Sequence, residues 1–239
     1  MNIPVTCIGK HFKQPFLVFI ALLLSSGIFA QAKEKSVHIC LKGTPGIYWL
    51  SATAPAMSNG AKFGFGYGAN VEIGLTETIY FVTGLEVNAA GAKYSSMDSV
   101  SNGKSKFLVS STANASIQYL QVPLFFKMKT KEIGMMKYFG QFGLGSGMVI
   151  SNHTAWTASS SFASVSGTDT KTGDLNLIRE ALLIGAGVEY NLSGSTSIIG
   201  SLMYDNGFTG VLASGNGPAG TPNPTFYSKG ITLTVGILF

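Results

Sequence analysis

Four ionisable residues stand out because each lies in a segment where apolar residues alternate with polar or small ones: Glu72, Glu86, Lys127 and Glu189. Such alternation places successive side chains on opposite faces of a β-strand, so these four should point away from the apolar face. Carboxyl groups beside an ammonium group can act as general acid and base. Buried charges are ordinarily paired, however, and mutual neutralisation is the role we expect here.

These residues need strands to position them, and the clearest predicted strand covers residues 62–75. Apolar residues occupy its odd positions, whereas Lys, Gly, Asn and Glu occupy the even ones. Residues 43–46, Gly-Thr-Pro-Gly, are expected to break the first predicted strand, and Pro123 is expected to need a local bulge because it cannot donate a ladder hydrogen bond. Weaker alternation predicts the other strands, which cover residues 37–50, 79–89, 115–129, 138–152, 175–192, 196–212 and 230–239.

The predicted connections alternate in length. Those after residues 75, 129 and 192 are short, whereas long polar loops are predicted over residues 95–111, 155–173 and 213–224. Eight strands with this asymmetry predict an all-β, antiparallel, up-and-down transmembrane β-barrel. Its short turns and both termini should lie in the periplasm. The interior of an eight-stranded barrel is just wide enough for side chains to fill.

The last predicted strand, residues 230–239, places five apolar residues on one face, ending at Phe239. In a water-soluble protein this face would form an exposed apolar edge unless it were buried in a β-sandwich, which is the alternative. Composition favours the membrane, because only 11% of the residues are charged, against about 25% in a typical soluble domain. No apolar run after residue 30 reaches the roughly 20 residues that a spanning helix needs. The Phe239 ending resembles the signal by which outer-membrane barrels are assembled.

Residues 1–32 have the pattern of a secretory signal peptide. Lys10, His11 and Lys13 precede an apolar stretch over residues 16–28, and Ala-Gln-Ala at residues 30–32 matches a small-x-small cleavage site. Cleavage there would leave residues 33–239 as one barrel domain, whereas an uncleaved anchor is the alternative. Removing two lysines from the 16 basic residues leaves 14 against 11 acidic ones, a mild excess that predicts no nucleic-acid partner.

Other motifs that could carry chemistry lack the context they need. Residues 215–220 match G-x-G-x-x-G, but Pro222 and Pro224 follow where a nucleotide-binding helix should begin. His38 and His153 are far apart and have no Cys or carboxylate at metal-ligand spacing. We therefore expect no catalytic residue, no cofactor and no metal site.

The segment over residues 119–130, Tyr-Leu-Gln-Val-Pro-Leu-Phe-Phe-Lys-Met-Lys-Thr, resembles the signature of the PorT-like outer-membrane β-barrel family. In that family a Tyr-Leu-(Glu/Gln)-(Ile/Val)-Pro-Leu block leads into a Lys-containing strand end. Residues 138–143 and the closing strand also fit, so the resemblance covers most of the processed chain. It implies the outer membrane of a Gram-negative cell, and one branch of the family is associated with protein secretion and gliding motility. Pro45 and Trp49 depart from the usual Gly-rich first strand.

These features together predict a non-enzymatic outer-membrane barrel with a packed lumen, acting as a structural or interaction protein of the cell envelope. An accessory role in protein secretion is the finer hypothesis. The expected partners are outer-membrane lipid, the barrel-assembly machinery and a protein bound through the external loops. The alternatives are a membrane-embedded enzyme acting on lipids, which should show a His, Ser and Asp set near one rim, and a narrow small-solute channel, which should conduct ions in planar bilayers.

Overall fold

The structure is a computed structural model of the 239-residue chain. It describes residues 36–52, 58–101, 106–160, 164–170, 175–211 and 226–239. The predicted signal peptide and the G-x-G-x-x-G segment lie outside the described residues. No helix in the described part of the chain is long and apolar enough to cross a membrane.

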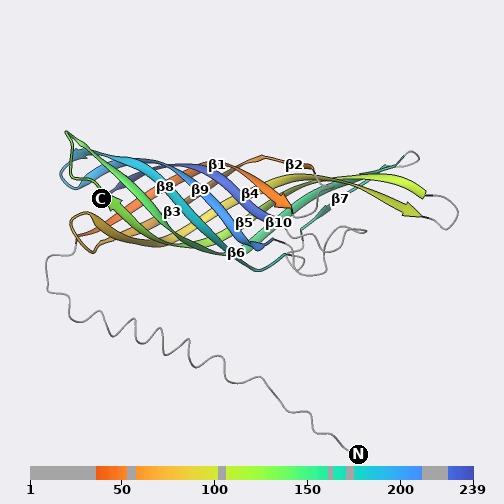
Figure 1. The fold of residues 1–239 in the computed structure, drawn as a ribbon, viewed down its shortest axis with the longest axis horizontal. Helices are drawn as coiled ribbons and strands as arrows, with labels where there is room; N and C mark the ends of the chain where they lie inside the picture. Colours follow the sequence, from red (N-terminus) through yellow and green to blue (C-terminus); the bar gives the residue numbers. More distant parts are fainter. Residues whose placement is uncertain (1–35, 53–57, 102–105, 161–163, 171–174, 212–225) are drawn as a thin grey trace, which may run out of the picture. The chain divides into compact units, whose positions relative to one another are not determined.

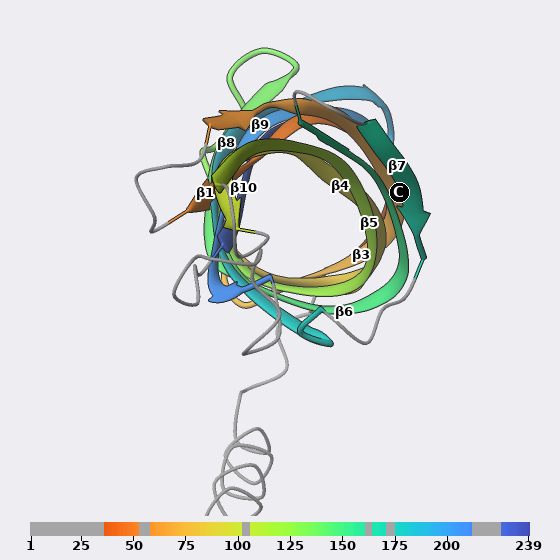
Figure 2. The same ribbon diagram turned by 90° about the vertical axis from the view of Figure 1, so that its right-hand side faces the viewer.

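Eight long antiparallel strands form one closed barrel (Figures 1 and 2). Each strand pairs with its neighbours along the chain, and pairing of the first strand with the last closes the cylinder. This confirms the predicted up-and-down barrel. The barrel strands are β1 (Val37–Ala52), β3 (Lys62–Gly74), β4 (Ile79–Ser101), β5 (Lys106–Lys129), β6 (Met136–Ser159), β8 (Ile178–Ser193), β9 (Thr196–Gly210) and β10 (Phe226–Leu238).

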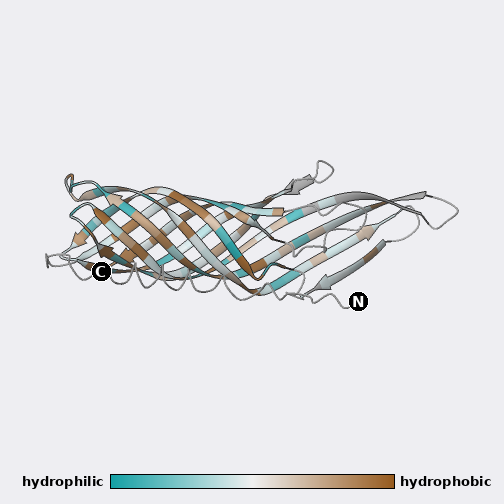
Figure 3. Ribbon diagram, turned by 60° about the horizontal axis from the view of Figure 1, so that its bottom comes forward, coloured by the Kyte–Doolittle hydropathy of each residue, from teal (hydrophilic) through white to brown (hydrophobic). Residues whose placement is uncertain are grey.

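Alternating burial along the strands confirms the predicted facing. On β10, Val235 and Phe239 are about half exposed on the outer wall, at 51% and 49%, whereas Thr234 and Leu238 point inward at 3% each. Leu238, which broke the pattern in the sequence, packs inside against Cys40 and another buried residue. Apolar residues recur along the barrel strands in Figure 3, as expected for a wall that faces lipid.

Two expected irregularities are absent. β1 runs without a break through residues 43–46, and Pro45 lies opposite Phe65 in the unshifted β1–β3 ladder. Pro123 lies opposite Gly145 in an equally regular part of the β5–β6 ladder, and the register shift occurs instead between Gln118 and Tyr119. The predicted break and bulge were wrong, because the register is the same before and after each proline. On the other side of each proline, however, two pairs are missing from the ladder, at residues 44–45 of β1 opposite β10 and at residues 122–123 of β5 opposite β4.

Two of the predicted long loops are partly strand. β4 and β5 pair continuously from Glu86 and Gln121 up to Ser101 and Lys106, and β6 continues beside β5 as far as Ser159. Two short strands, β2 (Ser58–Gly60) and β7 (Ser164–Asp169), pair with the extended parts of β4 and β6. We call this sheet the extension; it projects from the end of the barrel opposite the C-terminus (Figure 1). At about 3.3 Å per residue, β4 rises about 26 Å between residues 93 and 101.

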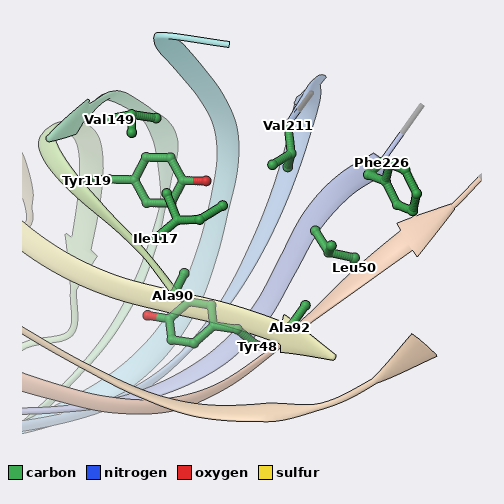
Figure 4. Packing of buried hydrophobic residues seen from close by; sticks show 9 residues of the cluster. All are labelled: Tyr48, Leu50, Ala90, Ala92, Ile117, Tyr119, Val149, Val211 and Phe226. Atoms are coloured by element: carbon green, nitrogen blue, oxygen red, sulfur yellow. The ribbon is translucent and has the colours of Figure 1, made fainter. Parts of the chain in front are cut away.

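The half of the lumen nearest the extension is apolar. Its buried side chains come from five barrel strands and from the residue that directly follows β9, so they fill the cylinder from several sides (Figure 4). This cluster, the apolar cap, consists of Tyr48, Leu50, Ala90, Ala92, Ile117, Tyr119, Val149, Val211 and Phe226. The charged residues lie in the remainder of the lumen.

The Tyr48 ring of the apolar cap lies between Gly64 and Gly230. A Cβ added at Gly230 would come within 2.5 Å of Tyr48 Cδ1, whereas a Cβ at Gly200 would meet nothing within 4 Å. We expect Gly230→Ala to lower the free energy of unfolding by about 1–3 kcal/mol through overpacking, and Gly200→Ala to leave it nearly unchanged. Urea unfolding of the barrel in lipid vesicles measures both. Equal stability of the two variants would show that the Tyr48 site accommodates the methyl group.

Candidate functional site

Four charged side chains meet inside the lumen at the end where both barrel termini lie. Lys127 Nζ lies 2.6 Å from Glu72 Oε1 and 2.6 Å from Glu189 Oε1. Lys129 Nζ lies 2.7 Å from Glu72 Oε2 and 2.8 Å from Glu189 Oε1. All four side chains are at most 5% exposed. We call them the proximal cluster, in which each lysine bridges both carboxylates.

Strand geometry brings these residues together although none of their strands are neighbours. Glu72 lies on β3, the lysines on β5 and Glu189 on β8, with β4 and β6 between them. Side chains that point into an eight-stranded barrel meet across its axis. Aromatic rings complete the surroundings, because Lys127 Nζ lies 4.0 Å from the Phe139 ring centroid and Lys129 Nζ lies 4.2 Å from that of Tyr80.

The fourth residue suggested by the sequence, Glu86, does not join the proximal cluster. Its carboxylate pairs with Lys42 of β1 at 2.5 Å. A further buried pair joins Arg179 of β8 to Asp205 of β9 at 2.5 Å, and Arg179 Nη1 donates to Gln121 Oε1 at 3.3 Å. We call these two the distal pairs. Among the described lumen residues, four cations therefore face four anions.

Sequence reasoning missed four of these eight residues, namely Lys42, Lys129, Arg179 and Asp205. Lys129 lies two positions after Lys127, so the alternation that placed Lys127 inside also places Lys129 there. The same count from Glu189 would have placed Arg179 inside. Lys42 could not be assigned a facing, because the first predicted strand was expected to break at the next residue, Gly43.

Two small cavities lie among the described lumen side chains. A cavity of about 20 Å³ lies between the distal pairs and is lined by Lys42, Glu86 and Asp205 together with Thr and Asn side chains. A second, of about 10 Å³, lies within the apolar cap. A single water needs about 10–15 Å³ measured in this way, so each cavity has room for about one water.

The remaining sequence candidates fall elsewhere. His38 Nδ1 lies 3.3 Å from the carbonyl oxygen of Phe239, whereas His153 is exposed on β6. Phe239 also exchanges two backbone hydrogen bonds with Ile39, which fixes the seam where the barrel closes. Within the described ranges, no three His, Cys, Asp or Glu side chains are grouped so that they could hold a metal ion.

Comparisons with known proteins agree with this architecture. A family model described as "Outer membrane protein beta-barrel domain" matches residues 29–213. The structure is similar to Neisserial surface protein A (9% identity, covering 86% of this chain and 98% of that one, TM-score 0.41). It is also similar to a major outer membrane protein from Thermus thermophilus (15% identity, covering 85% of this chain and 99% of that one, TM-score 0.41). A third similar structure is OprG from Pseudomonas aeruginosa (11% identity, covering 86% of this chain and 97% of that one, TM-score 0.36). No curated protein matches the chain significantly.

Proposed function

The chain belongs to the outer membrane protein β-barrel domain family, and from that premise we propose that it is a non-enzymatic barrel acting as a structural or interaction protein of the cell envelope. The observation that supports this most strongly is the filled lumen. Eight balanced charges and the apolar cap line the described interior, and the cavities of about 20 and 10 Å³ among them are each large enough for about one water. A partner would therefore have to meet the outer surface.

The extension is the surface we assign to a protein partner. It carries the paired ends of β4, β5 and β6 together with β2 and β7. Its backbone hydrogen bonds hold it as a sheet, so a partner would meet a preformed surface with little ordering cost. In this proposal lipid surrounds the barrel wall, and the assembly machinery recognises the last strand through Phe239.

The finer assignment is to the PorT-like branch, with an accessory role in protein secretion. The signature over residues 119–130 supports it, because this stretch supplies both lysines of the proximal cluster and, at Tyr119, one member of the apolar cap. The signature would then be a folding element that fills the lumen.

Capture of partners from native outer membranes tests the proposal. We expect cross-linking to recover a defined protein with the intact chain, and we expect a variant with residues 96–111 replaced by a two-residue turn to lose it. A control keeps the length of this hairpin but exchanges its sequence for another Ser- and Thr-rich hairpin. Identical cross-linked products from the intact and shortened chains would contradict an interaction role for the extension. Turnover of purified lipids by the intact chain would favour the enzyme alternative instead.

A further inference from the structure

The cavity of about 20 Å³ between the distal pairs, which we call the distal cavity, has a largely polar lining. It meets the charged side chains of Lys42, Glu86 and Asp205, and Thr, Tyr, Asn and Gln side chains complete most of its wall. The cavity in the apolar cap differs, because Leu, Ile, Ala and Gly residues line it apart from Tyr119 and Ser228. Cavities without polar partners stay dry, so of the two the distal cavity is the better place to hold a polar ligand.

Thr234 on β10 brings to this cavity a hydroxyl group that has no partner among the described protein groups. Its side chain is 3% exposed and lines the distal cavity, and Oγ1 forms no hydrogen bond with a described residue. A buried hydroxyl group without a hydrogen bond destabilises a folded protein, and native proteins usually satisfy such groups with a protein group or an ordered water. Thr234 therefore points to a ligand that can form a hydrogen bond inside the cavity.

Strand pairing is interrupted on two sides of the same cavity. The β1–β10 ladder lacks two pairs between residues 43 and 46 of β1, where its register places Thr44 opposite Thr234. The β4–β5 ladder lacks two pairs between residues 83 and 86 of β4, and Glu86 and Gln121 form the first pair after this interruption. All four of these side chains line the distal cavity. The polar lining thus gathers where both ladders supply fewer hydrogen bonds.

Charge and size together select a small, neutral ligand for the distal cavity. Lys42 already pairs with Glu86, and Arg179 with Asp205, so the two distal pairs balance each other's charges. An added ion would bring an uncompensated charge into the lumen, which is costly in a buried place. The volume of about 20 Å³ exceeds the roughly 10–15 Å³ that one water needs. A single water molecule meets both conditions and can also form several hydrogen bonds.

We propose that the distal cavity binds one water molecule, which accepts a hydrogen bond from Thr234 Oγ1 and donates hydrogen bonds to the carboxylates of Glu86 and Asp205. An ionised carboxylate offers about four acceptor sites, so ion pairing with Lys42 or Arg179 leaves acceptor capacity on each. Two carboxylates that face one cavity repel each other, and a donor between them reduces this repulsion. The water would join the two distal pairs and β10 in one hydrogen-bonded network across the lumen.

A high-resolution crystal structure of the purified barrel tests the site directly. We expect one isolated density peak at about 2.5–3.0 Å from Thr234 Oγ1 and from an oxygen of each carboxylate, the usual range for O–H···O hydrogen bonds. Thr234→Ser keeps the hydroxyl group and should keep the peak, whereas Thr234→Val should lose it. A distal cavity without density, or a peak that persists unchanged in Thr234→Val, would overturn the proposal. Anomalous scattering from the peak in crystals soaked in rubidium bromide would identify an ion and would overturn it as well.

The direction of the stability change in Thr234→Val tests the same site without crystals. With a bound water, losing the hydroxyl group breaks the network, so the midpoint of urea unfolding in lipid vesicles should fall. With a dry cavity, the exchange removes an unsatisfied buried group and the midpoint should rise. Thr83→Val makes the same exchange on the outer wall, two residues before Leu85, which is 58% exposed, and should not lower the midpoint. A midpoint of Thr234→Val at or above that of the unmodified barrel, or an equal fall in Thr83→Val, would contradict the bound water.

Discussion

Lys127→Met is expected to lower the free energy of unfolding of the barrel by about 3–5 kcal/mol, the cost of removing one partner of a buried ion pair. Lys127 contacts Glu72 and Glu189, each at 2.6 Å, and lies 2% exposed. Without it, two buried carboxylates share the single positive charge of Lys129. Urea unfolding in lipid vesicles, followed by tryptophan fluorescence, measures the loss.

A second change in the same variant separates charge from packing. Adding Glu189→Gln restores one cation to one anion, so we expect it to recover part of the stability that Lys127→Met removes. Lys137→Met is the control, because its contact with Glu132 spans 3.4 Å between side chains that are 41% and 40% exposed. Exposed pairs contribute about 0–1 kcal/mol. A loss for Lys127→Met no larger than this control would refute the role of the proximal cluster.

Val235→Lys is expected to cost about 2–4 kcal/mol and to reduce the yield of folded barrel, because a lysine near the middle of the bilayer faces hydrocarbon. Val235 is 51% exposed on the outer wall of β10, four residues before Phe239, which is about 9 Å along the membrane normal at about 3.3 Å per residue and a tilt of about 45°. Tyr227→Lys is the matched control on the same face, near the outer end of β10, where the cost falls to about 0–1 kcal/mol. Heat-modifiable mobility and urea unfolding report the difference. Equal yields of the two variants would mean that this face of β10 does not meet lipid.

Local alternation of apolar and polar residues predicted the barrel and which side chains point into its lumen, because both depend on the two-residue period of a strand. Glu72, Lys127 and Glu189 could be placed inside for this reason. Which charge meets which depends on the register between strands that are not neighbours. No local pattern encodes that register, so the separation of Glu86 into a pair with Lys42 could not be foreseen.

The strands of the extension could not be predicted from the sequence, for a different reason. Its residues are mostly Ser, Thr, Ala and Asn, and apolar residues do not alternate regularly among them. Pairing along β4 and β5 holds these residues in strands as far as Ser101 and Lys106. Periodicity of hydrophobic residues therefore ends where the membrane ends, although the ladder continues.

Different kinds of side chains close the two ends of the lumen. The apolar cap excludes water near the extension, whereas the proximal cluster fills the other end with paired charges. An ion entering from either end would have to displace packed side chains or break buried ion pairs. Under the proposed function, the barrel wall would contact lipid and the extension would be left for a protein partner.

Conductance of the purified protein in planar lipid bilayers tests this closed lumen most directly. With the unmodified barrel in concentrated potassium chloride, we expect no discrete openings above the bilayer baseline, while folded insertion is verified by heat-modifiable mobility of the same preparation. Stable, stepwise openings of the unmodified barrel would contradict the packed lumen and would favour the narrow channel.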